Sequence, residues 1–340
     1  MPIIKDNVGT LFSCLSGYNF YQLNRGCSLS DMEIHAVHCL SESGVEIRKT
    51  TTQLNPGELK KWKYFVEHPV NVTNMLWPID IVSLNDDLDI GLVFRARALP
   101  KMEPLKTILY NEDELDWRNP HIQDLVISFL KQCIDIHKNG YAYHSFDINR
   151  MFYNVASMEA FFDFSLSITP AQEVTAINSN DVGIEFLPPW CDIEGDNPMG
   201  LAEDYYSIAA ILFRLMIGRM PYQGRLMDGK GNMMNHLTDV DEDFHVMMFK
   251  AYHSTPVFVF DKNNTSNSIG LYTVEEKFVE RWEKLPEKIK KMFSETLIYS
   301  ENIRSKVYSD NGWLEAHGKI YSGYEWLEAL KSNCFGNKGD

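Results

Sequence analysis

The stretch from Gly140 to Ser165, GYAYHSFDINRMFYNVASMEAFFDFS, decides the fold of this chain. A loop carrying Asp147 lies between two apolar runs, and a second acid, Asp163, follows the strand-like run AFF. Two acids a short hairpin apart are what a phosphate-transfer site needs. One acid orients the attacking hydroxyl, and the other holds Mg²⁺ on the nucleotide phosphates.

Bulk properties set the limits on partners and location. The chain has 340 residues, enough for two packed subdomains. Its formal net charge of −15 argues against a nucleic-acid or anionic-membrane partner, because it would repel phosphate groups. The six cysteines are scattered without metal-ligand spacing, the start lacks the pattern of a signal peptide, and no apolar run is long enough to span a bilayer. We therefore expect a reduced, cytoplasmic setting.

The first hundred residues predict short strands. Segments 33–40, 45–52 and 89–96 mix β-branched and apolar residues between turn-forming residues. A helical run, ELKKWKYFVEH, follows Gly57 and is closed by Pro69. Residues 73–82 form another extended run, in which Pro78 indicates a turn or an edge strand.

After Pro100 the pattern becomes helical. Apolar residues repeat at three and four positions from Ile122 to Ile134, which predicts a helix with one apolar face. A second helix is predicted from Asp204, as N-cap, to Gly218, with a middle that is apolar nearly all round. A third is predicted over 286–297, whereas 223–280 shows no clear pattern. Strands first and helices later predict an α+β fold, with a small strand-rich lobe and a larger helical one.

These elements, in this order, are similar to the bilobal protein kinase fold over roughly residues 8–330. DYYSIAAILFRLMIGRMPY (204–222) resembles the family's D-x-x-S-x-G helix, EFLPPW (185–190) resembles the A-P-E end of the activation segment, and NIRS (302–305) resembles the late arginine motif. The runs LWPIDIV, PVFVFD and WEKLP are most like a divergent bacterial kinase-like group. The resemblance implies a kinase-like N-lobe over 1–97 and a helical C-lobe over 98–340.

In the N-lobe the resemblance implies a damaged nucleotide site. Gly17 is the one glycine in LSGYNFYQL, the stretch that matches the family's glycine-rich loop, so the phosphate cradle is poor. His38 stands where the family has its phosphate-binding lysine, and imidazole lacks that charge and reach. Glu58 is the best match to the helix-borne partner of that lysine; the alternative, with no lysine to bind, is a first-turn acid favoured by the helix dipole.

The catalytic loop is also altered. We align Asp147 with the family's general base; the alternative aligns His144 with the preceding histidine and puts Phe146 at the acid position. With Asp147 as base, the metal-binding asparagine position five residues later is Phe152, which cannot ligate Mg²⁺. Asp163, in D-F-S, matches the metal-binding acid of D-F-G and could hold one Mg²⁺.

Two further positions concern the structure around the loop. Trp190 stands at the A-P-E glutamate position, so a stacked contact with an arginine such as Arg304 is expected in place of the family's ion pair. Asp204 is expected to tie the backbone of the catalytic loop to its helix, as the matching acid does in the family.

The resemblance leads to a hypothesis of a pseudokinase: a regulatory or binding module with a degenerate ATP site and little or no phosphotransferase activity, acting on a protein partner. One alternative is an atypical active Ser/Thr kinase with Asp147 as base, Asp163 as Mg²⁺ ligand and a lysine such as Lys49 at the phosphates. A small-molecule phosphotransferase of the same fold is another. The family's cofactors are ATP and Mg²⁺, and the sequence leaves their binding to this chain, and its oligomeric state, open.

Overall fold

The computed structural model divides into two compact units, Met1–Pro100 and Lys101–Asp340. The structure describes residues 11–13, 20–28, 32–39, 45–50, 56–70, 72, 74–84, 89–95, 102–144, 146, 150–164, 168–173, 175–178, 186–191, 196–226, 256–298 and 320–336. In the first unit, side chains are described for 59–70, 72, 74–81 and 91–94.

The first unit is built on one antiparallel sheet with the strand order β1-β2-β3-β4-β6-β5. Its elements are β1 (Leu11–Ser13), β2 (Phe20–Ser28), β3 (Met32–Cys39), β4 (Val45–Thr50), α1 (Pro56–Glu67), β5 (Pro78–Leu84) and β6 (Asp89–Arg95). The strands and the helix predicted from the sequence are confirmed, with ends that differ by one or a few residues. Pro78 opens β5 at the edge of the sheet, where its missing N–H breaks no ladder.

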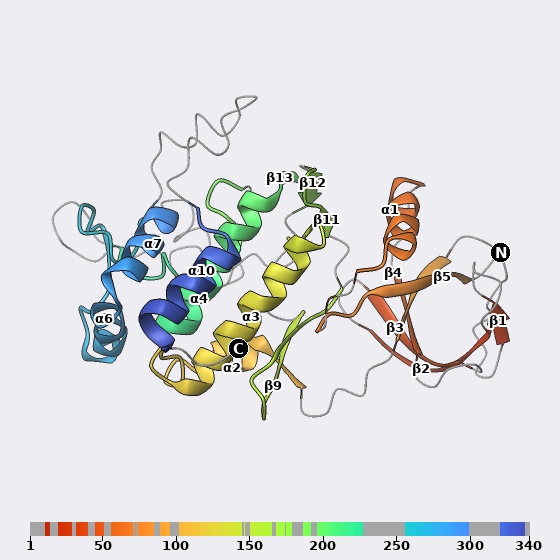
Figure 1. Cartoon of the computed structure of the whole chain (residues 1–340), viewed down its shortest axis with the longest axis horizontal. Helices are drawn as coiled ribbons and strands as arrows, with labels where there is room; N and C mark the ends of the chain where they lie inside the picture. The colour runs from red at the N-terminus through yellow and green to blue at the C-terminus, as the bar shows by residue number, and fades with distance from the viewer. Residues whose placement is uncertain are drawn as a thin grey trace, which may run out of the picture. The chain divides into compact units, whose positions relative to one another are not determined.

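Helix α1 packs against β5 (Figure 1), and two of its aromatic residues are buried. Trp62 and Phe65 lie one turn apart on the helix and are each at most 1% exposed. Phe65 meets Trp77 edge to face at 5.5 Å, and the indole Nε1 of Trp77 donates to the Phe65 carbonyl at 3.0 Å. This contact fixes the helix beside the start of the edge strand.

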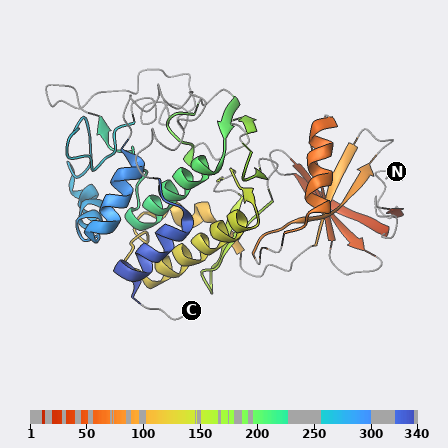
Figure 2. The ribbon, with the colours of Figure 1, turned by 45° about the horizontal axis from the view of Figure 1, so that its top comes forward.

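The second unit is mainly helical, with short two- and three-stranded sheets. Its elements are β7 (Met102–Pro104), α2 (Leu105–Leu109), α3 (Pro120–Lys138), β8 (Tyr141–Ala142), β9 (Met151–Asn154), β10 (Ala160–Phe162), β11 (Thr169–Pro170), β12 (Thr175–Asn178), β13 (Asp196–Met199), α4 (Leu201–Ile217), β14 (Arg225–Leu226), β15 (Asn267–Ser268), η3 (Thr273–Glu275), α6 (Glu276–Glu283), α7 (Glu287–Leu297), α10 (Gly323–Leu330) and η4 (Lys331–Phe335). Helices α3, α4 and α10 lie side by side (Figure 2). The α+β fold class is confirmed.

Helix α4 is the central helix of the second unit and is buried on nearly every side, as its apolar sequence predicts. Its start differs from the prediction. Gly200, and not Asp204, is the N-cap, because the extended Gly200 backbone lets its amide donate to Oε2 of Glu203 at 2.7 Å. Asp204 therefore lies in the first turn, with its carboxylate turned to the neighbouring loop.

The run PVFVF, which gave no clear pattern in the sequence, closes the core beside α4. Phe258 and Phe260 pack with Phe213 of α4 and Trp282 of α6, and the rings of Phe260 and Trp282 stack at 4.6 Å. Phe293 of α7 joins the same aromatic group. Among the helices that the structure describes, none combines the length and the apolar character that a bilayer crossing requires.

Candidate functional site

The β9–β10 hairpin places Asp163 at a defined position. The two strands pair antiparallel, with Met151 opposite Phe162, and β9 also pairs with β7. One step further along the hairpin, the Asp163 amide donates to the Arg150 carbonyl at 2.9 Å. The residue across from Asp163 is therefore Arg150.

Asp163 itself is held at several atoms. Asp163 is buried, with 5% of its surface exposed. Its Oδ1 accepts a hydrogen bond from the amide of Phe164 at 2.9 Å. Its carbonyl accepts the hydroxyl of Tyr143 at 2.8 Å. The acid that follows the hairpin is thus fixed to the loop that precedes the hairpin.

The loop between β8 and β9 is anchored by the packing of one aromatic side chain, Phe146. Phe146 is 2% exposed and lies among Phe129 of α3, Tyr143 and Phe162 of β10, with ring centroids 5.4 to 6.4 Å apart. A residue so enclosed is a core residue. Under the alignment that puts Phe146 at the acid position, that position carries no polar group.

Asp204 ties the loop to helix α4, as expected. Its Oδ2 accepts the amide of Tyr143 at 2.6 Å, and its Oδ1 accepts the amide of His144 at 2.8 Å. The side chain of Asp204 is fully buried. Because the loop backbone has left the strand β8 at this point, these two amides depend on the carboxylate for their partners.

Two histidines surround the same carboxylate. Nε2 of His137 lies 2.9 Å from Oδ2 of Asp204, and Nδ1 of His144 lies 3.1 Å from Oδ1. Burial works against ionisation of Asp204, yet the charge of His144 and the hydrogen bonds from His137 and His144 bring its pKa well below the usual range. The ionised carboxylate only accepts, so Nε2 of His137 donates. His144 also reaches the hydroxyl of Thr169 at 2.9 Å and has a left-handed backbone with φ of 56°.

Trp190 makes a contact that the sequence analysis did not predict. Its indole Nε1 donates to Oε1 of Glu203 at 3.1 Å, while Oε2 of Glu203 accepts the Gly200 amide. Burial raises the pKa of Glu203 to about 8, although both hydrogen bonds act in the opposite direction. Arg304, the partner expected for Trp190, lies outside the described residues.

The remaining predicted site residues are distributed as follows. Gly17 and Asp147 lie outside the described residues. His38 lies on β3 opposite Gln22 of β2, and Glu58 is near the start of α1, with both side chains outside the described part. These three N-lobe positions, Gly17, His38 and Glu58, belong to the first unit, and Asp163 belongs to the second.

Two positions on β9 have structural roles. Phe152 pairs with Phe161 of β10 on one side and with Pro104 of β7 on the other, so it lies on the central strand of a three-stranded sheet. Asn154 lies on the same strand, and its Oδ1 accepts the amides of Ala156 and Ser157 at 2.8 and 3.1 Å. Asn154 thus begins the turn of the hairpin.

The described residues do not fit the family's pair of metal ligands. Mg²⁺ requires oxygen ligands, and Asp163 supplies one carboxylate, but the residue across the hairpin is a cation and Phe152 carries no ligand atom. Within the described ranges, no group of three or more His, Cys, Asp or Glu side chains could hold a metal ion. Nothing in this hairpin therefore completes a magnesium site around Asp163.

No protein-family model matches the chain, and no curated protein matches it. Among solved structures, the chain is similar to one described as "Structure of vaccinia related kinase 3", with 11% identity and a TM-score of 0.45. The match covers 82% of this chain and 90% of the other.

Arg150, Glu203 and His137 are the residues of this region that sequence reasoning missed. A signal existed for Arg150, because it directly precedes the strand-like run MFYN and Asp163 directly follows AFF. Joining the two strands as a hairpin pairs the residues at their open end. Glu203 and His137 gave no signal, because their partners are distant in the sequence.

Proposed function

We propose that this chain is a kinase-like binding or regulatory module with little or no phosphotransferase activity. The observation that carries the proposal is that Arg150, which has no metal-ligand atom, pairs with Asp163 across the hairpin. The order of the elements and the contacts of Asp204 support the kinase-like fold. The residues of the hairpin support the loss of activity.

The proposal holds for each alignment of the loop. With Asp147 as base, the asparagine position is Phe152; with His144 as the family's histidine, the base position is Phe146. If the residue across from Asp163 marks the asparagine position, the same five-residue spacing sets the base at Ser145, which has no carboxylate. In every case at least one required group is missing.

The loss of these groups should raise the activation barrier of phosphoryl transfer by several kcal/mol, on the order of 3 kcal/mol for each group. Phosphoryl transfer depends on positioning and on the neutralisation of charge by metal ions and cationic side chains. Removing one electrostatic contact of this kind typically costs about 3 kcal/mol in the barrier. Two together reduce the rate by roughly four orders of magnitude, since about 1.4 kcal/mol corresponds to a factor of ten.

The proposed ligand class is a protein partner. The formal charge of −15 disfavours nucleic acid, and several large side chains are exposed, among them Tyr110 at 61% and Tyr324 at 57%. Any residual nucleotide binding would be regulatory. The cytoplasmic setting stays a prediction.

A transfer assay with radiolabelled ATP tests the proposal. The full chain is incubated with γ-labelled ATP, Mg²⁺ or Mn²⁺ and a generic protein substrate, beside an Asp163→Ala variant. We expect equal, background incorporation into the chain and the substrate for both proteins. Incorporation by the unchanged chain that Asp163→Ala abolishes would instead establish the alternative, an atypical active kinase.

A further inference from the structure

Two consecutive residues, Tyr143 and His144, contact both ends of the segment that follows the β9–β10 hairpin. The hydroxyl of Tyr143 donates to the carbonyl of Asp163 at 2.8 Å. Nε2 of His144 lies 2.9 Å from the hydroxyl oxygen of Thr169. All four residues are buried. Positions 163 and 169 are thus tied to a single dipeptide.

That dipeptide is itself fixed to helix α4. Asp204 accepts the amides of Tyr143 and His144 at 2.6 and 2.8 Å, and its Oδ1 lies 3.1 Å from Nδ1 of His144. The backbone of His144 is left-handed, a conformation that is unfavourable for a residue with a side chain and persists only where the surroundings impose it. With this conformation, the two neighbouring side chains reach opposite ends of the segment.

The far end of the segment depends on this side-chain contact. Strands β8 and β11 have two residues each, with Thr169 opposite Ala142, and a strand pair this short is marginal by itself. The hydroxyl of Thr169 can donate to a neutral imidazole or accept from a charged one, so its contact with His144 does not depend on the charge of the ring. Just inside the two ends, Phe164 and Ile168 are fully buried. Displacing both ends would therefore break both hydrogen bonds and expose both apolar side chains.

We propose that Tyr143 and His144 form a two-armed clamp that keeps Asp163 and Thr169, and with them both ends of this segment, on the loop after β8. The clamp is a property of the fold and requires neither a nucleotide nor a metal ion. The inference goes beyond the proposed function, because it concerns the conformation of the segment and applies whether or not the chain transfers phosphate. A clamp also implies that the two ends open together as one unit.

Amide hydrogen exchange tests the clamp, measured by NMR at Phe164 and Ile168 in the full chain without ligand. Tyr143→Phe removes one hydroxyl and keeps the ring that packs on Phe162. Thr169→Val removes the other hydroxyl and keeps the branched shape. The double variant removes both arms.

The matched control is Tyr206→Phe, because the buried hydroxyl of Tyr206 donates to the hydroxyl of Tyr222 at 3.0 Å and contacts neither end of the segment. Circular dichroism confirms that each variant is folded. The control should leave the exchange rates at Phe164 and Ile168 unchanged.

Each single variant should quicken exchange about tenfold at both amides, the factor expected for loss of one buried hydrogen bond from a unit that opens as a whole. The double variant should quicken it about a hundredfold. A change confined to the altered end, or no change in folded variants, would overturn the clamp.

The unchanged chain provides a second test that needs no variant. Without ligand, the amides of Phe164 and Ile168 should exchange at least about a hundredfold more slowly than in an unstructured peptide. Addition of ATP and Mg²⁺ should not be required for this protection. Exchange at the unstructured rate at either amide would overturn the inference, and the radiolabel test of the proposed function would be unaffected.

Discussion

The indole Nε1 of Trp190 donates a 3.1 Å hydrogen bond to Oε1 of Glu203, and both side chains are buried. This contact joins the end of the EFLPPW run to the first turn of α4. The same turn carries Asp204, which holds the amides of Tyr143 and His144. The start of α4 therefore organises both segments that flank the candidate site.

Replacing Trp190 by Phe should remove one partner of the buried Glu203 carboxyl. Loss of such a hydrogen bond costs about 1 to 3 kcal/mol, in addition to the effect of the smaller ring. The matched control is Trp326→Phe, because Trp326 is fully buried and its Nε1 has no hydrogen-bond partner among the described residues. Urea unfolding should show a larger loss for Trp190→Phe. Equal losses would mean that the hydrogen bond contributes nothing to stability.

The raised pKa of Glu203, about 8, makes stability depend on pH. Between the ordinary carboxyl pKa near 4.5 and this value, the folded state binds more protons than the unfolded state, so stability falls as pH rises. The slope is at most about 1.4 kcal/mol per pH unit. Glu203→Gln should remove it. Unfolding free energies measured at pH 5, 6, 7 and 8 should therefore fall more steeply with pH for the unchanged chain than for Glu203→Gln, and parallel curves would contradict a raised pKa for Glu203.

Asp204 should contribute stability with the opposite dependence on pH. Its pKa is lowered in the folded state, so its contribution is complete above the unfolded carboxyl value and is lost as pH falls toward the folded one. Asp204→Asn should destabilise the chain by about 3 kcal/mol at neutral pH, because a buried charge partner and an amide acceptor are removed. Amide hydrogen exchange at Tyr143 and His144 should quicken.

The control for this change is Asp261→Asn, since Asp261 accepts one backbone amide at a solvent-exposed turn. Its cost should stay within about 0.5 kcal/mol. Comparable costs for the two substitutions would show that the buried contacts of Asp204 are not what stabilises the loop.

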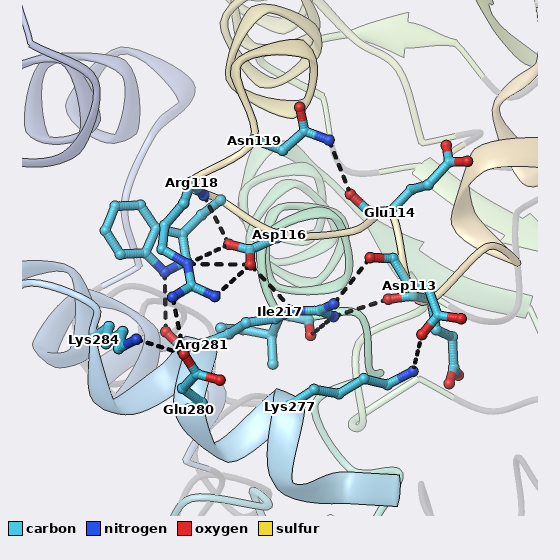
Figure 3. A network of polar contacts seen from close by, with 12 residues as sticks. Asp113, Glu114, Asp116, Arg118, Asn119, Ile217, Lys277, Glu280, Arg281 and Lys284 are labelled. Carbon is cyan, nitrogen blue, oxygen red and sulfur yellow. Dashed lines mark hydrogen bonds and ion pairs between the residues drawn. The ribbon is translucent and has the colours of Figure 1, made fainter.

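Arg281 and Arg118 belong to one network of polar contacts (Figure 3). We expect their contributions to the free energy of unfolding to differ greatly. Arg281 is 5% exposed and donates to three carbonyls, those of Glu112, Asp113 and Ile217, at 2.9 to 3.2 Å. Arg281→Lys cannot reach all three and should cost about 3 kcal/mol or more.

Arg118→Lys, the matched change, alters the ion pairs with Asp116 and Glu280 on the exposed side of the same network. It should cost no more than about 1 kcal/mol, and less at high salt. Denaturation curves at 0.05 and about 0.5 M salt compare the two. An equal, salt-dependent loss for both variants would contradict the difference in burial.

The periodic elements of this fold were predictable, because alternation and three-to-four spacing report directly on which face is buried. Helix α4 is an example. The role of Asp204 was predicted differently, from the family resemblance. The N-cap was misplaced because Asp204 is a good capping residue by type, whereas Gly200 adopts the extended backbone and Glu203 takes its amide.

The site was predictable only where a side chain follows a strand. Asp163 was found in this way, but Arg150 was not, because its position depends on the register set by the turn that Asn154 begins. The partner of Trp190 also depends on tertiary contact. A single sequence carries no local pattern for the pair of Trp190 and Glu203.

A hairpin that builds no divalent-metal centre should leave ligand binding independent of Mg²⁺. The most direct measurement is the thermal unfolding midpoint of the full chain with saturating ATP, in Mg²⁺ and in EDTA, beside Asp163→Asn. A metal-dependent ligand at about 100 times its Kd would stabilise the chain by about 2.7 kcal/mol, a shift of several degrees. We expect equal midpoints in Mg²⁺ and EDTA for both proteins. A shift of that size that requires Mg²⁺ and disappears in Asp163→Asn would contradict it.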